Sequence, residues 1–274
     1  MPLAVSQTPT IGAEIRGIDL SQDISQENVE WLEAQLVRHK VIFFRDQNID
    51  PAAHLGFARK FGELETHPVN PKEGFSEIMV LHNNAEKPPS GTAVWHSDVT
   101  WRAKPSLGSI LIARKVPNVG GDTLFADMEA AYEFLDDATQ SEIKGMKAIH
   151  QFAPMRRYLI ESGADAERLA RFDLDYPPVL HPLVRTHPVT GRKSLYVNAL
   201  FTVGIEGVPN DEAKRLLRNL FATAVRPEIQ CRFRWQENSI AFWDNRSCQH
   251  YATADYYPNE RLMERVTIQG DQPF

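Results

Sequence analysis

The chain has 274 residues, of which 42% are hydrophobic and 24% are charged, and its formal net charge is -6. This composition is typical of a soluble globular protein with a sizeable core. It argues against broad nucleic-acid binding, which needs a basic surface, and no apolar run is long enough to cross a membrane. The N-terminus lacks a basic segment followed by an apolar one, and only two cysteines are present, so we expect a cytoplasmic protein.

The first half of the chain combines predicted helices with short apolar strands. Residues 26–38 carry Val29, Leu32 and Leu36 at helical spacing, and a second helix is expected over 51–61 with a proline at its start. Runs of strand-forming residues predict strands at 41–44, 78–81, 107–113 and 123–125. Helical spacing then continues over 128–145 and ends at a glycine, which predicts a single helix there.

The second half is expected to contain more hairpins. A strand is predicted at 147–152, and the polar, proline-bounded stretch 154–178 is interpreted as an insertion or lid. Segments 181–185 and 193–198 form one predicted hairpin, and 230–235 and 239–243 form another. Asn210 is the expected N-cap of a helix that extends to residue 224, and a last strand covers 262–269.

Short strands joined by turns dominate this map. The sequence shows no regular alternation of strands and helices and no glycine-rich dinucleotide motif. We therefore expect a mainly β fold with flanking helices around a double-sheet jelly roll, the cupin-like double-stranded β-helix. Residues 1–274 are expected to form a single domain that carries the lid near 154–178.

One short motif points to a metal site. His96 is the only one of nine histidines that stands two residues before a carboxylate, that of Asp98. Residues i and i+2 of an extended segment point to the same side, so both side chains can reach one ion. Taken alone, the motif is more often a polar loop with a hydrogen-bonded His–Asp pair.

Features near the C-terminus strengthen the metal hypothesis. His250 follows an apolar strand and a polar turn, and a third ligand from a distant strand would complete the two-histidine, one-carboxylate set of non-haem Fe(II) oxygenases. Arg261 and Arg265 lie at the start of the last predicted strand. Arginine suits bidentate recognition of a carboxylate or sulfonate, although two surface arginines in weak salt bridges are the alternative.

Several longer stretches show a family resemblance. The chain resembles the taurine dioxygenase family of Fe(II)/2-oxoglutarate-dependent oxygenases, which also includes alkylsulfatases and phenoxyalkanoate dioxygenases. The resemblance extends from Gly12 to Asp271. It is carried by WHSDVTW at 95–101, GGDTLFAD at 120–127, LHPLVRTHPVTGRKSLYVN at 180–198, WDNRSCQHYATADY at 243–256 and RLMERVTIQGD at 261–271.

The resemblance implies specific roles for residues along the whole chain. It implies an iron triad of His96, Asp98 and His250, and a grip on the distal carboxylate of 2-oxoglutarate by Thr123 and Arg261. Arg265 corresponds to an arginine that faces the sulfonate of the prime substrate and lies near the co-substrate. The remaining implied substrate contacts are the His67 side chain, the backbone N–H of Val99 and the aromatic ring of Phe201.

Three positions depart from the pattern of taurine enzymes. Asn70 stands where tyrosine is typical, and Thr92 where asparagine is typical. Arg156 falls, by a count without gaps from Thr123, where an aromatic residue packs on taurine. These changes keep the anion clamp and alter the part of the pocket that contacts the rest of the substrate.

The resulting hypothesis is a dioxygenase that uses Fe(II), 2-oxoglutarate and O2 to hydroxylate a small organic anion, taurine or another sulfonate, with succinate and CO2 as products. The same chemistry on an alkyl sulfate, an aryloxyalkanoate or an amino-acid-like intermediate is the first alternative. A non-redox, cupin-like metal-binding protein is the alternative of another class. A homo-oligomer is expected, with no nucleic-acid or membrane partner.

Overall fold

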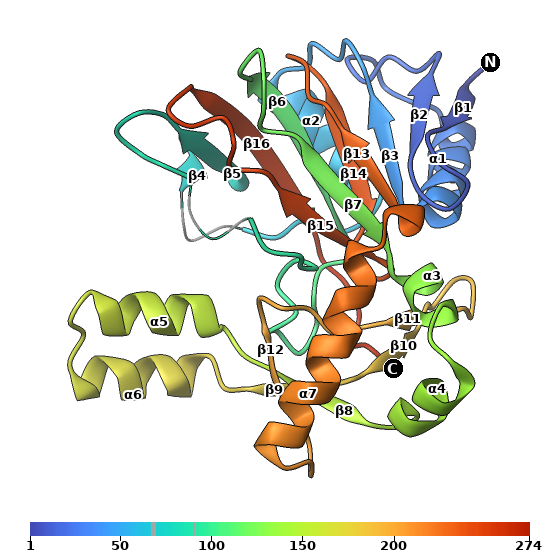
Figure 1. Ribbon diagram of the computed structural model, residues 1–274. Coiled ribbons are helices and arrows are strands. Elements are labelled where there is room, and N and C mark those ends of the chain that lie inside the picture. The colour runs from blue at the N-terminus through green and yellow to red at the C-terminus, as the bar shows by residue number, and fades with distance from the viewer. Residues whose placement is uncertain (67–69, 90, 92) are drawn as a thin grey trace.

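Eight strands form one large sheet in the upper half of the molecule, seen in a computed structural model that describes residues 1–66, 70–89, 91 and 93–274 (Figure 1). Neighbouring strands are antiparallel except for the parallel pair β2–β3. In spatial order the strands are β1 (Leu3–Ser6), β2 (Ala13–Arg16), β3 (Val41–Phe44), β14 (Ile240–Asp244), β6 (Gly108–Lys115), β16 (Arg261–Ile268), β5 (Phe75–Asn83) and β4 (Pro71–Lys72).

A second sheet faces the first one. It has the order β13 (Gln230–Phe233), β7 (Thr123–Asp127) and β15 (Cys248–Ala252). Phe43 of β3 stacks on Phe233 of β13 with ring centroids 4.1 Å apart, and its edge contacts Phe125 of β7 at 5.6 Å. The two sheets therefore enclose one apolar core between them.

The continuous apolar runs in β3 and β14 reflect burial on both faces of the large sheet. Val41 and Phe43 belong to the core between the sheets, whereas Ile42 and Phe44 belong to a second core on the opposite face. Helices α1 (Gln26–His39) and α2 (Pro51–Arg59) contribute to this second core. A strand covered on both faces needs apolar residues at every position, because successive side chains alternate between the faces.

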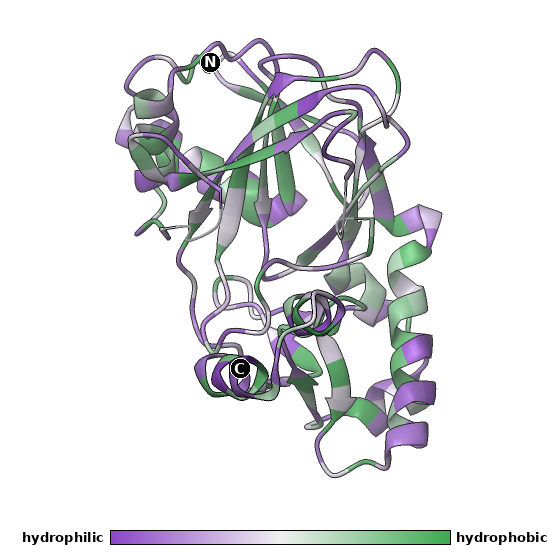
Figure 2. Cartoon of the chain, turned by 90° about the vertical axis from the view of Figure 1, so that its left-hand side faces the viewer, coloured by the Kyte–Doolittle hydropathy of each residue, from purple (hydrophilic) through white to green (hydrophobic). Residues whose placement is uncertain are grey.

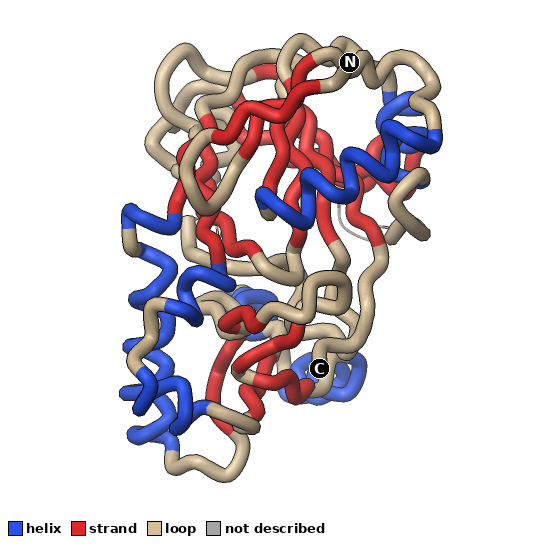
Figure 3. Tube along the Cα trace, turned by 90° about the vertical axis from the view of Figure 1, so that its right-hand side faces the viewer, coloured by secondary structure: helices blue, strands red, loops and turns tan. Residues whose placement is uncertain are grey.

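The lower half of the molecule is a smaller mixed layer (Figure 3). Its core gathers around Leu183, Leu195, Leu217 and Leu220, all nearly inaccessible to solvent. Its elements are α3 (Met128–Glu133), α4 (Asp137–Ile143), the sheet of β12 (Thr202–Ile205), β8 (Lys147–His150) and β9 (Val179–Pro182), the pair β10 (Val184–Thr186) and β11 (Lys193–Leu195), α7 (Asn210–Phe221), and 3₁₀ turns at Ala222–Val225 and Pro227–Ile229.

Two helices, α5 (Ala153–Glu161) and α6 (Ala166–Asp175), project from this lower half as an arm (Figure 1). Figure 2 views the molecule from the side to which the arm points. Each helix has one buried residue, Leu159 in α5 and Phe172 in α6. Arg156 joins the helices through bonds of 2.8 and 3.0 Å to the two carboxylate oxygens of Asp173. The predicted lid segment is thus a helical hairpin.

Three details of the predicted map are wrong. The helix expected over 128–145 is two short helices, because Asp136 caps a new helix by accepting from the backbone N–H of Thr139. Asn210 is the first helical residue, and the N-cap is Pro209, which offers no side-chain hydrogen bond. The segments near 230–235 and 239–243 do not pair with each other, because β13 joins the small sheet and β14 the large one.

Other expectations hold in whole or in part. The helices predicted from 26 and 51 begin at Gln26 and Pro51, as expected. The hairpin expected across 181–198 consists of the pair β10–β11, whereas the neighbouring strand β9 pairs with β8. Among the described residues, no helix is both long and apolar enough to cross a membrane.

Candidate metal centre

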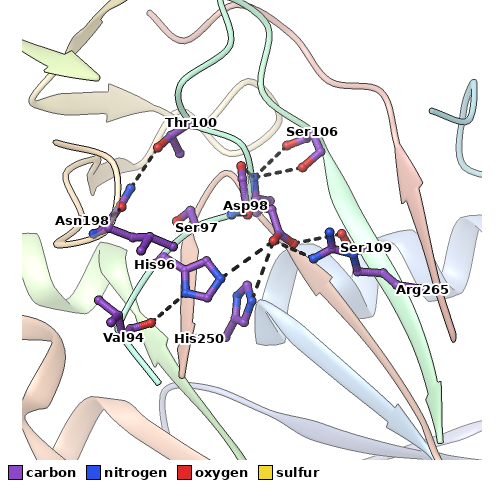
Figure 4. Close-up of polar contacts among 12 residues, drawn as sticks. Val94, His96, Ser97, Asp98, Thr100, Ser106, Ser109, Asn198, His250 and Arg265 are labelled. Carbon is purple, nitrogen blue, oxygen red and sulfur yellow. Dashed lines mark hydrogen bonds and ion pairs between the residues drawn. The ribbon is translucent and has the colours of Figure 1, made fainter. Parts of the chain in front are cut away.

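The side chains of His96, Asp98 and His250 point toward one another (Figure 4). The Nε2 atoms of His96 and His250 lie 4.0 and 3.9 Å from Oδ1 of Asp98. The backbones of His96 and His250 also form a reciprocal pair of hydrogen bonds, of 3.1 and 2.8 Å. This pairing brings two histidines that are far apart in the sequence into one site, with their ring centroids 4.2 Å apart.

The two imidazoles are in the form that binds metals. His96 donates from Nδ1 to the carbonyl oxygen of Val94 at 2.7 Å, which leaves the lone pair of Nε2 facing the other ligand atoms. Burial lowers the pKa of His96, and burial together with the neighbouring His96 lowers the pKa of His250 to about 3. Both rings are therefore neutral near pH 7, and a neutral imidazole nitrogen is a metal donor.

Asp98 is held at both its carboxylate and its backbone. Ser109 of β6 donates to Oδ2 at 3.0 Å, and Arg265 of β16 donates to Oδ1 at 2.8 Å. The side chain of Asn245 accepts from the backbone N–H of Asp98 at 2.6 Å and donates to its carbonyl oxygen at 2.9 Å. Burial acts to raise the pKa of Asp98, but Arg265 and the two imidazoles outweigh it, so this pKa lies well below its ordinary value.

The turn after Asp98 is strained, and hydrogen bonds to Thr100 hold it in place. Val99 has φ 46°, a left-handed conformation that β-branched residues rarely adopt. The Thr100 hydroxyl bonds to Nδ1 of His150 and accepts from Nδ2 of Asn198, both at 3.0 Å, and His181 contacts the Thr100 carbonyl oxygen at 2.9 Å. This buried network holds the strained turn beside the ligands, where such strain is commonly functional.

Thr123 and Arg261 form a second part of the site, and both are buried. Arg261 is only 6% exposed, forms no ion pair with any carboxylate in the described part of the chain, and leaves its Nε without a hydrogen-bond partner. Thr123 Oγ1 accepts from Trp235 Nε1 at 2.9 Å, so its own proton is free to donate. A buried guanidinium beside a free hydroxyl fits a carboxylate that comes from a ligand.

Gly121 leaves the room that Arg261 needs. It has φ +74°, and an added Cβ would lie 3.2 Å from Cδ and 3.3 Å from Nε of Arg261. Gly120 and Gly121 both have positive φ, which suits the turn before β7. Gly121 therefore has two roles: it allows the turn, and it leaves space for the side chain of Arg261.

One cavity of about 750 Å³ joins the two parts of the site. The three candidate metal ligands, Thr123, Arg261 and Arg265 line it, and so do three other residues expected in the pocket, Asn70, Val99 and Phe201. The arm contributes Met155, Leu159 and Phe172 to its wall. The size is in the range of sites that enclose drug-sized ligands.

Not every predicted pocket residue is found in this wall. Arg156 is absent from the lining and is paired with Asp173 within the arm instead. His67 and Thr92 lie outside the described residues. Two tryptophans that the sequence motifs do not mark as pocket residues, Trp101 and Trp243, also line the cavity.

Sequence reasoning did not find the residues that support the ligands. Ser109 lies inside an apolar strand, and nothing in its neighbourhood marks it as a partner of Asp98. Asn245 lies in the polar turn before His250, and its side chain holds the backbone of Asp98. A polar residue in a fully buried strand is the one signal that could have identified Ser109, because buried hydroxyls need partners.

Comparisons with known proteins agree with this geometry. Residues 4–267 match the model of the taurine catabolism dioxygenase TauD, TfdA family. The chain is 34% identical to an alpha-ketoglutarate-dependent sulfate ester dioxygenase of Pseudomonas putida, over 96% of this chain and 88% of the relative. It is 32% identical to a (S)-phenoxypropionate/alpha-ketoglutarate-dioxygenase of Sphingobium herbicidovorans, over 96% and 93%.

Solved structures show the same likeness. A taurine dioxygenase from Burkholderia xenovorans superposes with a TM-score of 0.86 at 33% identity, covering 99% of this chain and 90% of that one. The structure of AAD-2 in complex with Mn(II) and N-oxalylglycine gives a TM-score of 0.84 at 31% identity, covering 100% and 99%. With its mainly β architecture and its match over nearly the whole length, the chain belongs to the taurine catabolism dioxygenase TauD, TfdA family.

Proposed function

We propose that this protein is an Fe(II)- and 2-oxoglutarate-dependent dioxygenase that oxidises an organic anion, with succinate and CO2 as products. The observation that carries the proposal is the buried set of His96, Asp98 and His250, whose ligand atoms lie within 4.8 Å of one another. Two neutral imidazoles and one carboxylate suit Fe(II) and leave coordination positions for other molecules. The ion would supply O2 activation, driven by decarboxylation of 2-oxoglutarate.

The residues of the chain would then position both organic molecules. Arg261 pairs with the distal carboxylate of 2-oxoglutarate, and the free proton of Thr123 hydrogen-bonds to the same group. Trp235 keeps the hydroxyl of Thr123 in place through its 2.9 Å bond. Arg265, which already donates to Asp98, faces the anionic group of the prime substrate and orients Asp98 at the same time.

The prime substrate belongs to the sulfonates or a related class of anions. Taurine or another sulfonate is the first candidate, and an alkyl sulfate, an aryloxyalkanoate or an amino-acid-like intermediate are alternatives with the same chemistry. Relatives named for sulfate esters and for phenoxypropionate support these alternatives. A cavity of about 750 Å³ favours a substrate larger than taurine, because taurine with 2-oxoglutarate would leave much of it empty.

We further infer that the two facing sheets form the double-stranded β-helix of the jelly roll and that the whole chain is one domain. The family match over residues 4–267 supports a single unit that includes the arm. A homo-oligomeric state and a cytoplasmic location remain predictions.

The test is turnover of the Fe(II)-loaded protein with 2-oxoglutarate. Succinate formation and O2 consumption are measured with a panel of sulfonates, alkyl sulfates and aryloxyalkanoates, and sulfite release is measured with the sulfonates. Asp98→Ala is expected to abolish the activity, with Glu206→Ala, at an exposed position, as the control. Full activity of Asp98→Ala would refute the triad. Absence of O2 uptake with every substrate would favour a non-redox metal-binding protein.

The two arginines are tested separately. Arg261→Met is expected to raise the KM for 2-oxoglutarate at least about thirtyfold, since loss of one partner of a buried charge pair costs about 2 kcal/mol or more. Arg265→Ala is expected to raise the KM of the prime substrate strongly. If Arg265→Ala impairs only 2-oxoglutarate binding, Arg265 belongs to the co-substrate clamp.

A further inference from the structure

The arm brings positive charge to the cavity that the proposed chemistry does not use. Arg168 and Arg171 of α6 both line the cavity. Arg168, Arg171 and Phe172 share one face of α6, because residues three and four positions apart lie together on a helix. The arm therefore directs a basic edge as well as an apolar side chain toward the cavity.

One of these two arginines is not neutralised. Arg171 pairs with Asp175, one turn further along α6, at 3.0 Å. Arg168 forms no ion pair with any carboxylate of the described residues. The chain as a whole has a net charge of -6, so this edge departs from the average of the surface. An unpaired cation that lines a cavity raises the local concentration of anions.

An apolar stretch separates this edge from the metal centre. Phe201 lies beside His96, with ring centroids 6.3 Å apart, and Phe152 follows it at 6.4 Å. Phe152 stacks on Trp101 at 4.3 Å and contacts Phe172 of α6 at 6.1 Å. All five of these side chains line the cavity, so its wall is aromatic from the ligand His96 to the arm.

We propose that the prime substrate carries a second anionic group, which binds at Arg168 of the arm while the first lies at Arg265. The two anionic groups are joined by an apolar chain or ring that lies along the aromatic wall. This inference rests on the proposed function, because the inner anion is placed by the metal centre. The new element is that the arm selects substrates by the negative charge at the end far from the metal centre.

The experiment compares linear alkane-1-sulfonates with α,ω-alkanedisulfonates of equal length, from butane to decane. Dissociation constants are measured by calorimetry on the full-length protein loaded with Mn(II) and N-oxalylglycine. At one or more lengths the disulfonate is expected to bind about two- to fivefold more tightly than the monosulfonate, the range of a solvent-exposed ion pair, after the factor of about two that comes from its two equivalent ends has been divided out. The preference is expected to weaken at high salt.

Two charge reversals locate the effect. Arg168→Glu is expected to lower the ratio of the two dissociation constants at least about fivefold, because an attraction is replaced by a repulsion. Arg157→Glu is the matched control, since Arg157 is an exposed arginine of α5 that does not line the cavity. The control is expected to leave the ratio as it is.

The inference is overturned if the ratio stays near one at every length, or if both reversals shift it equally, which would indicate long-range steering of any anion. Succinate formation with Fe(II), measured in parallel, separates this outcome from a failure of the proposed function. Succinate formation without a preference for the disulfonate would contradict the proposed distal site and leave the proposed dioxygenase activity standing. A preference that depends on Arg168 without any turnover supports the distal site and removes the proposed dioxygenase activity.

Discussion

The metal centre and the arm face the same cavity but are built in opposite ways. At the centre, the single residue Asp98 has hydrogen-bond partners from three places: β6, β16 and the turn before β15. All three metal-ligand candidates are buried. The arm has one buried residue in each helix and an ion pair that is partly exposed. Rigid support suits the metal centre, because the reaction tolerates little displacement of the reacting groups. The few contacts of the arm allow this part of the cavity wall to move more easily.

The largest difference in stability is expected when one aromatic side chain is removed from the body that carries the metal centre and one from the arm. Phe242→Ala, in the core under the large sheet, is expected to lower the free energy of unfolding by about 3–5 kcal/mol. Phe172→Ala is expected to disorder the arm while the global transition changes little, because the arm opens locally. Urea unfolding measures the first effect, and amide exchange across 153–175 the second. An equal loss of global stability in both variants would contradict the comparison.

Acid should act on the body rather than on the arm. Burial lowers the pKa of His54 to about 4 and that of His150 to about 3. The unfolded chain therefore binds protons that the folded one does not, so stability is complete above about pH 6.5 and falls as the pH drops toward 4. His54 alone accounts for roughly 3 kcal/mol of this loss.

Urea unfolding at pH 7 and at pH 4.5 measures this dependence. In His54→Leu the difference between the two pH values is expected to shrink, whatever the variant does to stability at pH 7. An unchanged difference would show that His54 is not the group that titrates.

Loss of Asn245 tests how far the centre depends on its support. Asn245→Ala leaves the backbone N–H and C=O of Asp98 buried without their partners, which is expected to cost about 1–3 kcal/mol of stability. Metal affinity is expected to fall about 10- to 100-fold, as for other residues that orient a ligand. Titration with Mn(II), followed by tryptophan fluorescence, measures the affinity. Unchanged affinity would make Asn245 a purely structural residue.

The smallest effect is expected at the ion pair of the arm. Arg156→Gln removes the bidentate bond to Asp173. The side chain of Arg156 is 35% exposed and that of Asp173 is 39% exposed. Such pairs contribute at most about 1 kcal/mol, so thermal unfolding is expected to shift little. A large loss of stability would mean that the arm is as firmly built as the centre.

Local pattern in the sequence determined the helices at 26 and 51, the apolar strand at 41–44 and the His–Ser–Asp motif. Each depends on spacing over a few residues, which periodicity and capping express directly. The resemblance then named Thr123, Arg261 and Arg265, and all three line the cavity with the proposed ligands.

Tertiary structure alone decided which distant residues meet. The segments 230–235 and 239–243 read as a hairpin because a short polar turn joins two strand patterns, yet their partners lie in different sheets. Ser109 and Asn245 reach Asp98 only through the fold, as does the pairing of His96 with His250. Such contacts depend on how the strands and sheets pack. Asn245 is 147 positions from Asp98 and Ser109 is 11 positions from it, and neither separation belongs to a local pattern that predicts a contact.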